Sequence, residues 1–255
     1  MEKPEQSNST IVPWNPVWAV AFAIIIYFAA SLFGGLILWA GISILPWSDA
    51  QATNWLDHST ASQFIYILLV EALSLGAVVL FLKQYRQRWS VIGFKRPQLR
   101  DAGIGLLAYP IYFIAFAIVL VLATKFIPGL DIDQEQQLGF DNVQGTLALV
   151  MTFVSLVVLP PLVEEIIVRG LIFTSLRKYL KFFGAALVTS LVFAAAHLPE
   201  GGASGPLYIA AIDTFMLSMV LCFLREKTGS LWAGITLHAL KNGVAFISLF
   251  ILVGR

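Results

Sequence analysis

The stretch of sequence that decides the fold is residues 146–180, which read TLALVMTFVSLVVLPPLVEEIIVRGLIFTSLRKYL. Its first part, 146–159, is apolar and carries no charge, and a proline pair, Pro160 and Pro161, follows directly. The part after the prolines is again apolar but holds two glutamates and an arginine in its first half, and an arginine and a lysine near its end. Apolar runs of this kind are typical of helices that cross a membrane. Ionisable side chains at membrane depth are as a rule functional or tightly paired, so the stretch predicts a polar site within a membrane protein.

The composition of the whole chain agrees with this interpretation. Of its 255 residues, 58% are hydrophobic and 12% are charged, whereas a soluble domain is about 25% charged. Windows long enough for membrane helices fall at 17–42, 63–82, 104–126, 146–159, 183–198, 206–224 and 231–253. We therefore expect an all-α fold, a multi-pass transmembrane helical bundle of seven or eight membrane segments that forms a single domain over 1–255.

The charge and the cysteine count exclude several classes of function. A net charge of +1 and the lack of a basic tract interleaved with aromatic residues give no sign of a nucleic-acid partner. The single cysteine, Cys222, lies in an apolar segment, so one chain can form neither an internal disulfide nor a thiolate metal site. We also find no internal repeat, which disfavours a transporter built from duplicated halves.

The connections between the apolar segments differ in charge, which predicts their sides of the membrane. The link between the second and third segments holds six basic residues: Lys83, Arg86, Arg88, Lys95, Arg96 and Arg100. This link should be cytoplasmic, with the N-terminus on the same side. Two connections without lysine or arginine should lie outside, and their acidic residues are Asp49, Asp57, Asp131, Asp133, Glu135 and Asp141.

The proline pair leaves the fourth crossing open between two alternatives. Proline removes a backbone donor and clashes with the preceding turn, so we expect a break or kink there. As one straight helix the stretch would be about 50 Å long, which is too long for one crossing. One alternative is a single broken crossing, which places Arg177 inside and Glu164 in the outer half of the membrane. The other is two crossings, 146–159 and 161–180, which brings Glu164 towards the cytoplasmic side.

Most of the polar side chains at membrane depth fall in three short motifs: Glu164-Glu165-Ile-Ile-Val-Arg169, Phe193-Ala-Ala-Ala-His197 and His238-Ala-Leu-Lys-Asn242. In the first motif, Glu165 and Arg169 share one helix face and are expected to form an ion pair. Glu164 points about 100° away and is left to face a cavity. A chain reversal near 181–184 would bring Glu164 and His197 to a similar depth.

The other two motifs complete a candidate hydrolytic site. Phe193 lies one turn before His197, so its ring should pack beside the imidazole. Glu164 is expected to act as the general base that takes a proton from water. His197 would hold the same water or pass the proton to a leaving amine. His238 and Asn242, which share one helix face, can donate hydrogen bonds to the oxyanion of a tetrahedral intermediate.

A metal site is the alternative use of the same residues. Glu164, His197 and His238 make a set of two histidines and one carboxylate, of the kind that zinc hydrolases use. The sequence has no His-Glu-x-x-His motif that would support a zinc protease. Zinc therefore stays open as a cofactor.

In this order and on apolar segments, the three motifs resemble those of the CPBP membrane proteins, also called the CAAX prenyl protease or Abi family, which include the Ras-converting endopeptidases. Agreement extends to Gly170 after the arginine, to the run Thr228-Gly-Ser-Leu-Trp232 and to the Gly93-Phe94 turn. The resemblance covers about residues 146–250. Val168 departs from the family's pattern, which often has an aromatic residue before the arginine, and this departure concerns packing.

The resemblance implies an intramembrane endopeptidase that cuts a membrane-associated peptide, such as a prenylated CAAX-type or bacteriocin-like one. It implies that Glu164 activates water with His197, while His238 and Asn242 form the oxyanion site, in a metal-dependent or a metal-free mechanism. The supporting residues would be Glu165, Arg169 and Phe193. Membrane lipid and a membrane-bound or lipidated substrate are the implied partners, and a bacterial inner membrane is the expected location.

Two other functions stay open. The chain could be a binding or immunity protein that keeps the fold without catalysing a reaction. It could also be an ion-coupled transporter that uses three further intramembrane ionisable residues, Glu71, Asp213 and Lys241. Asp213 could instead support the site or form a helix-packing hydrogen bond, and a buried Lys241 would need a partner.

Overall fold

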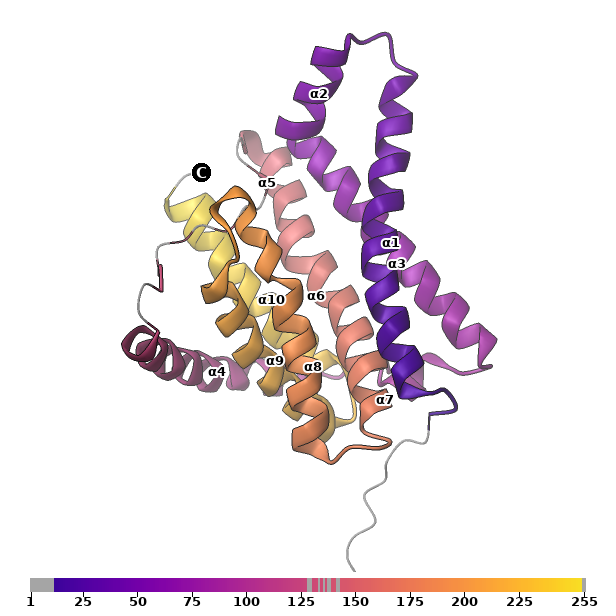
Figure 1. Ribbon diagram of the computed structural model, residues 1–255, viewed down its shortest axis with the longest axis vertical. Helices are drawn as coiled ribbons and strands as arrows, with labels where there is room; N and C mark the ends of the chain where they lie inside the picture. Colours follow the sequence, from indigo (N-terminus) through magenta and orange to yellow (C-terminus); the bar gives the residue numbers. More distant parts are fainter. Residues whose placement is uncertain are drawn as a thin grey trace, which may run out of the picture.

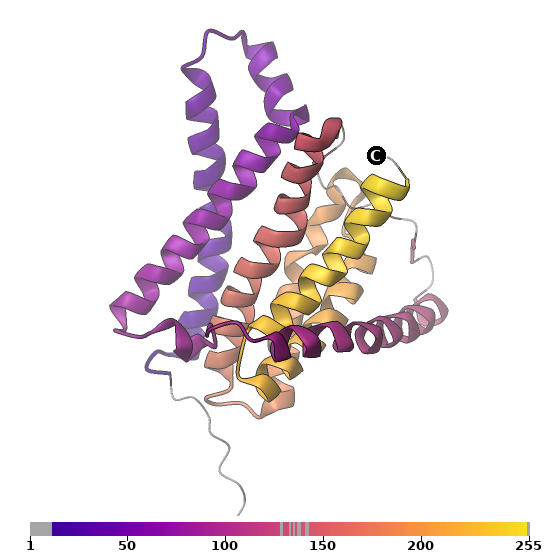
Figure 2. The same cartoon turned by 180° about the vertical axis from the view of Figure 1, so that it is seen from behind.

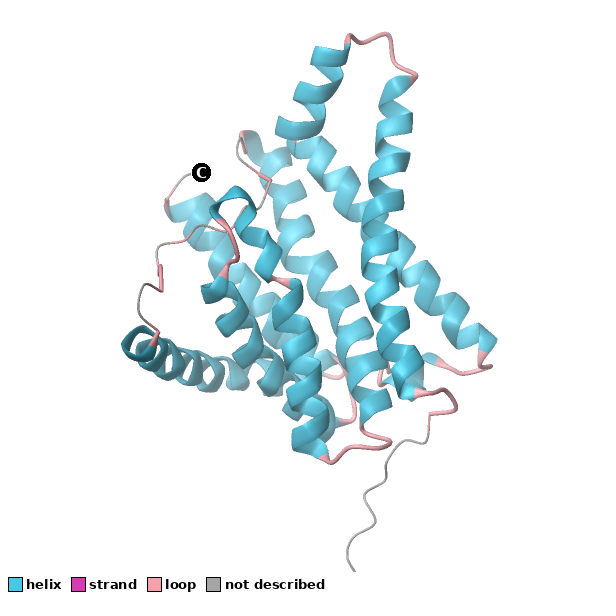
Figure 3. Cartoon of the chain, viewed as in Figure 1, coloured by secondary structure: helices cyan, strands magenta, loops and turns pink. Residues whose placement is uncertain are grey.

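The structure is a computed structural model that describes residues 12–127, 130–132, 134, 136, 139–140 and 143–253, with Ala203 and Ser204 described by their backbone alone. This part of the chain consists of helices and loops, with no strand in it (Figure 3). Within it, seven helical stretches are long and apolar enough to cross a membrane: Pro16–Ser43, Thr60–Gln84, Leu99–Phe126, Gly145–Leu176, Phe182–Gly202, Tyr208–Thr228 and Trp232–Leu252. The predicted all-α membrane bundle is confirmed. The N-terminal residues 1–11 and the acidic residues Asp133, Glu135 and Asp141 lie outside the described residues.

The helices carry the labels of Figure 1. The first half of the chain forms α1 (Pro16–Ser43), α2 (Asp49–His58), α3 (Thr60–Gln84), a 3-10 turn (Trp89–Ile92) and α4 (Leu99–Phe126). The fourth apolar stretch forms α5 (Gly145–Phe153), α6 (Leu159–Glu164) and α7 (Thr174–Leu176), joined by the π-helical segments η2 (Val154–Val158) and η3 (Glu165–Phe173). The last part forms α8 (Phe182–Ala196), the 3-10 segment η4 (Leu198–Ser204), α9 (Tyr208–Thr228) and α10 (Trp232–Phe246), which continues as η5 (Ile247–Leu252).

The fourth stretch stands at the centre of the bundle. In Figure 1, α1 and α3 cross one another as a pair, with α2 at their upper end, and they pack against the element from α5 to α7. The helices α8, α9 and α10 lie on the other side of that element, and α4 lies across α10 (Figure 2). The central element thus touches helices from both halves of the chain, which brings the side chains of its motif inside the bundle.

The contact between α4 and α10 depends on a glycine. A Cβ atom on Gly105 would lie 2.5 Å from the backbone oxygen of Ala233 and 2.8 Å from Cβ of Thr236. Only a residue without a side chain fits at this distance. Around this point α4, α9 and α10 bury an apolar cluster: Ala108, Tyr112, Leu217, Leu221, Leu224, Ala233 and Leu237. Gly105 therefore lets α10, which carries the third motif, pack closely on α4.

The proline pair does not divide the fourth crossing, and the irregularity expected there takes the form of the π-helical segment η2. The elements α5, η2, α6, η3 and α7 follow one another without a gap from Gly145 to Leu176 (Figure 1). Pro160 and Pro161 lie in the first turn of α6, directly after the π-helical η2. A π-helical turn holds more residues than an α-helical one, which makes room for the proline rings. Of the two alternatives, the described residues support one crossing here and seven segments in total.

The prolines also leave a backbone oxygen without its helical donors. The carbonyl of Leu156 would accept from residue 160 in an α-helix or from residue 161 in a π-helix, and both are prolines that have no N–H. The side-chain amide of Asn242 on α10 donates to this oxygen at 2.9 Å. The proline pair thus creates the acceptor that fixes Asn242 against η2.

Basic residues gather at one end of the bundle. The start of α1 and the ends of α3 and α7 lie together at the lower end in Figure 1, where Lys178 donates to the backbone oxygen of Val12 at 3.1 Å. Arg177, also at this end, forms an ion pair of 2.7 Å with Glu226 near the end of α9. The charge rule predicts that this end is cytoplasmic.

The position of Glu164 along the central element bears on the side of the membrane, which the sequence left open. At 1.5 Å of rise per residue, Glu164 lies about 18 Å from Leu176 at the basic end and about 28 Å from Gly145 at the other end. It is therefore nearer to the basic end, because the helix continues through the prolines well beyond the length of one crossing.

We expect Gly105→Ala to lower the stability of the protein, because its methyl group would meet the backbone of α10 at 2.5 Å. Overpacking of this kind costs about 1–3 kcal/mol. Gly103→Ala on the same helix is the control, since nothing lies within 4 Å of its Cβ position. Thermal unfolding of the purified protein in detergent should show a lower midpoint for Gly105→Ala alone. Equal midpoints for the two variants would mean that the crossing tolerates a side chain.

Candidate active site

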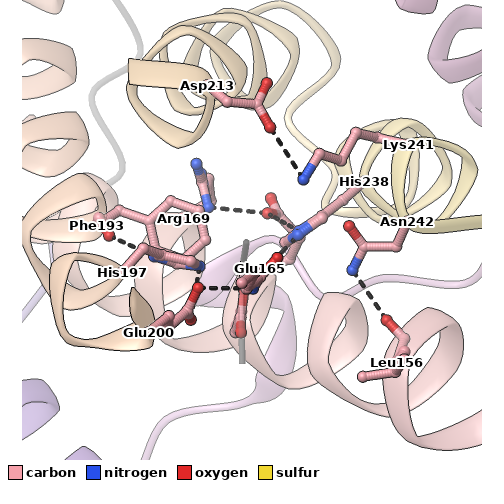
Figure 4. A network of polar contacts seen from close by, with 12 residues as sticks. Leu156, Glu165, Arg169, Phe193, His197, Glu200, Asp213, His238, Lys241 and Asn242 are labelled. Carbon is pink, nitrogen blue, oxygen red and sulfur yellow. Dashed lines mark hydrogen bonds and ion pairs between the residues drawn. The ribbon is translucent and has the colours of Figure 1, made fainter. Parts of the chain in front are cut away.

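A cavity of about 260 Å³ lies between α6, α8, α9 and α10, and the three motifs meet in its wall. The residues that the sequence predicted as catalytic all line it: Glu164, His197, His238 and Asn242. Phe193 lines it too, together with four polar residues outside the predicted set: Gln136, Glu200, Thr214 and Lys241. We call this cavity the polar chamber, and Figure 4 shows the contacts around it.

Glu165 and Arg169 form the predicted ion pair, behind the polar chamber and not in its wall. Nη1 of Arg169 lies 2.9 Å from Oε1 of Glu165, and the two side chains are 0% and 1% exposed. The guanidinium carbon also lies 4.5 Å from the centroid of the Phe193 ring. Charges removed from water need such close partners. The pair therefore joins η3 to α8 at a point that water does not reach.

Glu164 points into the polar chamber, as its spacing predicted. Its side chain is 31% exposed, and its Oε2 lies 3.7 Å from Nε2 of His238. Glu164 is the last residue of α6 and Glu165 the first of η3, and successive helical residues point about 100° apart. One carboxylate is therefore buried with an arginine while its neighbour faces the cavity.

His238 lies between the two carboxylates, and its protonation follows from them. Its Nδ1 lies 3.3 Å from Oε1 of Glu165. The same Glu165 oxygen accepts a hydrogen bond from Nη1 of Arg169 and acts as an acceptor here too, so Nδ1 of His238 carries the proton. A neutral imidazole then has a lone pair on Nε2, and this nitrogen faces Glu164 and the polar chamber.

His197 has the same tautomer by a different contact. Its Nδ1 lies 2.8 Å from the backbone oxygen of Phe193, which only accepts, so Nδ1 carries the proton. Its Nε2 lies 3.9 Å from Oε1 of Glu200. The Phe193 ring stands edge-on to both imidazoles, with centroid distances of 4.7 Å to His197 and 6.0 Å to His238. The predicted contact between Phe193 and His197 is confirmed.

Glu200 is a chamber residue that sequence reasoning missed. It lies in η4, three residues after His197, and its Oε2 accepts from Nε2 of Gln136 at 2.7 Å. The i,i+3 spacing from His197 was a usable signal for Glu200. Gln136 comes from the polar connection before α5, where no pattern marked it.

Lys241, for which the sequence offered no partner, is paired with Asp213. Nζ of Lys241 lies 3.0 Å from Oδ2 of Asp213, and the Tyr112 hydroxyl on α4 donates to Oδ1 of the same carboxylate. The lysine side chain is 27% exposed and lines the polar chamber. A positive charge is thus held in the wall by α4 and α9. Glu71, the third residue of the transporter hypothesis, does not line the chamber.

The arrangement of the side chains does not fit the zinc alternative. Two imidazole lone pairs and a carboxylate are groups that zinc accepts. However, no three or more His, Cys, Asp or Glu side chains in the described part of the chain come together so that they could hold a metal ion. His238 lies beside Glu164, whereas His197 faces Glu200. The described residues thus offer no set of three ligands for zinc.

A glycine on α10 makes room for the buried ion pair. A Cβ atom on Gly234 would lie 2.8 Å from Oε2 of Glu165. Because Gly234 has no Cβ atom, α10 can approach η3 closely enough for His238 to reach Glu165. No sequence pattern marked Gly234, because the need for a glycine arises only from the element packed against it.

Comparison with known proteins bears on the same part of the chain. A family model described as "Rce1-like: Type II CAAX prenyl endopeptidase Rce1-like" matches residues 146–244, which hold all three motifs. Over these residues the chain is similar to the CAAX proteases. The resemblance seen in the motifs is thereby confirmed, and the match indicates a CAAX-type protease in a multi-pass membrane protein. No curated protein and no solved structure matches the chain.

We expect Arg169→Met to destabilise the protein strongly, because Glu165 would remain as a buried charge without a counterion. Loss of one partner of such a pair costs about 3–5 kcal/mol. The double variant Glu165→Gln/Arg169→Met removes both charges and should regain most of that loss. Thermal unfolding measures both effects, with Glu164→Gln as a control that should change little. A double variant no more stable than Arg169→Met would contradict the importance of the pairing.

Proposed function

We propose that the protein is an intramembrane endopeptidase in which Glu164 activates a water molecule for attack on a peptide bond. The observation that carries the proposal is the Glu164 carboxylate in the chamber wall, 3.7 Å from the Nε2 lone pair of His238. Two acceptors this close together can each take one hydrogen of the same water molecule. The family match supports the reaction class.

The steps of the proposed reaction follow from where the protons lie. Glu164 takes one proton from the water as the water oxygen attacks the carbonyl carbon of the peptide bond. The carbonyl oxygen becomes the oxyanion of a tetrahedral intermediate. The proton then passes to the leaving nitrogen, directly from Glu164 or through Nε2 of His197, and the C–N bond breaks. The products are a carboxylic acid and an amine, and the acid then gives its proton to the amine or to solvent water and becomes a carboxylate.

Asn242 is the proposed donor to the oxyanion. His238 is instead proposed to accept a hydrogen bond from the attacking water. His238 donates its Nδ1 proton in a hydrogen bond to Glu165. A neutral imidazole has no second N–H, so His238 has no donor for the oxyanion. Asn242 has two amide hydrogens and gives one to the Leu156 carbonyl, which leaves one for a ligand. The ammonium of Lys241 in the same wall adds a positive charge that favours the oxyanion.

A membrane-associated peptide is the proposed substrate. A second, mostly apolar cavity of about 370 Å³ lies between α1, η3 and α8 and also reaches Glu164 and His197. Tyr27 and Phe28 of α1 line it and are 50% and 67% exposed. Such a cavity admits an apolar or lipid-modified segment from the bilayer. The classes to test are prenylated CAAX-type and bacteriocin-like peptides, and the proposed location is the inner membrane of a bacterium.

The other two functions have less support. A transporter that binds an ion at Lys241 and Asp213 would have to break their pairing, which has an N–O distance of 3.0 Å. A binding or immunity protein without activity needs neither a partly exposed Glu164 nor two imidazoles with fixed tautomers. The hydrolytic proposal uses all of these features.

We expect Glu164→Gln to abolish cleavage without loss of stability, because the amide keeps the shape of the carboxylate but takes no proton from water. Loss of a general base lowers the rate by about 10²–10⁴-fold. Mass spectrometry of new peptide termini would compare membranes from cells that produce the wild type and the variant. Substrates found in this way would then be tested as synthetic peptides with the purified protein.

The control is Glu226→Gln, the same replacement at the basic end of the bundle, which should cleave like the wild type. If cells with Glu164→Gln yield the same new termini as cells with the wild type, the hydrolytic proposal fails. A binding or immunity function would then be favoured.

Cleavage should also survive chelation, because no three ligands in the described residues are arranged to hold a metal. The measurement is the cleavage rate after dialysis against a zinc chelator, together with elemental analysis of the purified protein. One zinc per chain, combined with loss of cleavage that added zinc restores, would contradict the metal-free mechanism.

A further inference from the structure

A second cluster of charges lies at the basic end of the bundle, outside the polar chamber. A cavity of about 130 Å³ there is lined by four basic residues, Lys95, Arg96, Arg100 and Lys227, by Asp101 and by uncharged polar side chains. None of its residues lines the polar chamber. Figure 2 shows the link from α3 to α4 passing beside the start of α10. We call this the basic cavity.

Among the described residues, none of the four cations of the basic cavity has a carboxylate within ion-pair distance. The ion pairs formed by the described residues involve none of the four, whereas Arg177 at the same end is paired with Glu226 at 2.7 Å. Asp101 is the one acid in the wall, so four positive charges stand against one negative charge. Like charges held together repel one another, and a bound anion would offset that repulsion.

Two helices begin at the basic cavity and add to its positive potential. Helix α4 starts at Leu99 and α10 at Trp232, and Gln98, one residue before α4, and Ser230, two residues before α10, line the cavity. The positive ends of both helix dipoles therefore lie at the cavity. The two helix dipoles add to the attraction for an anion that the four cations provide.

The surroundings of the basic cavity are those of a membrane surface. Leu99 is 93% exposed, and Phe223, whose ring centroid lies 5.6 Å from Nζ of Lys227, is 47% exposed. Trp232 donates its indole N–H to the backbone oxygen of Lys95 at 2.7 Å, and tryptophan is common where a helix meets the headgroups. Exposed apolar side chains beside unpaired cations match a ligand that has both an anionic group and acyl chains.

We propose that the basic cavity binds the phosphate headgroup of an anionic phospholipid. The charge rule places this end of the bundle at the cytoplasmic leaflet, where anionic lipids attract clusters of lysine and arginine. A free phosphate ion has the same anionic chemistry without acyl chains, so the two ligands can be told apart by experiment. The proposal goes beyond the peptidase activity and does not depend on it.

A lipid bound at this cavity would brace the helix that carries the third motif. The backbone N–H of Leu231, just before α10, donates to the Gly93 oxygen at 3.0 Å. Gly93 has φ +85°, and a Cβ atom there would lie 2.5 Å from the guanidinium carbon of Arg225, so the link is pressed against α9. An anion between Lys95 on the link and Lys227 on α9 joins the same segments. Bound lipid should therefore raise the thermal stability.

The test measures thermal unfolding of the full chain in detergent with three additions: dioleoylphosphatidylglycerol, dioleoylphosphatidylcholine and inorganic phosphate. We expect the phosphatidylglycerol to raise the unfolding midpoint by a few degrees, as a ligand specific for the folded state does. The phosphatidylcholine and the phosphate ion should leave the midpoint unchanged. The affinity for phosphatidylglycerol is measured in parallel by native mass spectrometry.

Two variants of equal charge separate the basic cavity from the rest of the surface. Lys95→Gln/Arg96→Gln/Lys227→Gln should bind phosphatidylglycerol about a hundredfold more weakly, since each basic residue near the headgroups contributes roughly fivefold. The control, Lys83→Gln/Arg86→Gln/Arg88→Gln, removes three charges from the end of α3 and the start of the link, outside the cavity, and should bind like the wild type. Without lipid, the unfolding midpoint of the cavity variant should be no lower than that of the wild type, because the repulsion among the basic side chains of the cavity is relieved.

If the triple cavity variant does not fold, Lys227→Gln against Arg86→Gln repeats the comparison with an expected loss of about fivefold. Equal weakening in the cavity and control variants would mean that only the general surface charge acts, and it would overturn the proposal. Equal affinity for the phosphatidylcholine would overturn it too. A full shift of the midpoint with inorganic phosphate alone would show a phosphate-ion site and would equally overturn a lipid site.

Discussion

The burial of two opposite charges, Glu165 and Arg169, constrains most of the structure. Their side chains are 1% and 0% exposed, and ions taken out of water cost several kcal/mol each unless they are closely paired. Helices from other parts of the chain must therefore close around the pair. Phe193 of α8 covers the guanidinium, His238 of α10 reaches the carboxylate, and Gly234 lets α10 approach. The same contacts orient the side chains of the polar chamber, so fold and site rest on one interaction.

Local spacing and composition allowed a good part of this arrangement to be predicted. The membrane helices follow from the length of the apolar runs, and the pair of Glu165 with Arg169 follows from the i,i+4 rule. The separation of Glu164 from that pair and the contact of Phe193 with His197 follow from helical geometry and are confirmed as contacts. The catalytic roles of these side chains stay predictions, because they depend on a reaction and not on packing.

Features set by contacts between distant segments were beyond the reach of the sequence. The helix continues through the proline pair, and the freed oxygen of Leu156 finds its donor on Asn242, 86 residues along the chain. The partner of Lys241 comes from α9, and that partner is itself held by a tyrosine of α4. The tautomer of His238 follows from Glu165 only once α10 lies beside η3. Each of these needs the packed bundle before any rule of spacing applies.

Both histidines of the polar chamber use their Nδ1 protons in hydrogen bonds, to the backbone oxygen of Phe193 and to Glu165, and turn Nε2 to the chamber. With Glu164 and Glu200, the wall therefore presents mostly lone pairs, and it donates chiefly through Asn242 and Lys241. Such a surface can accept hydrogen bonds from a peptide, which carries an N–H on almost every residue. In the proposed reaction, hydrolysis turns a peptide bond, which can donate its N–H to this wall, into an acid end that mostly accepts hydrogen bonds. A wall with few donors holds such an end less well, so cleavage itself would speed the departure of one product.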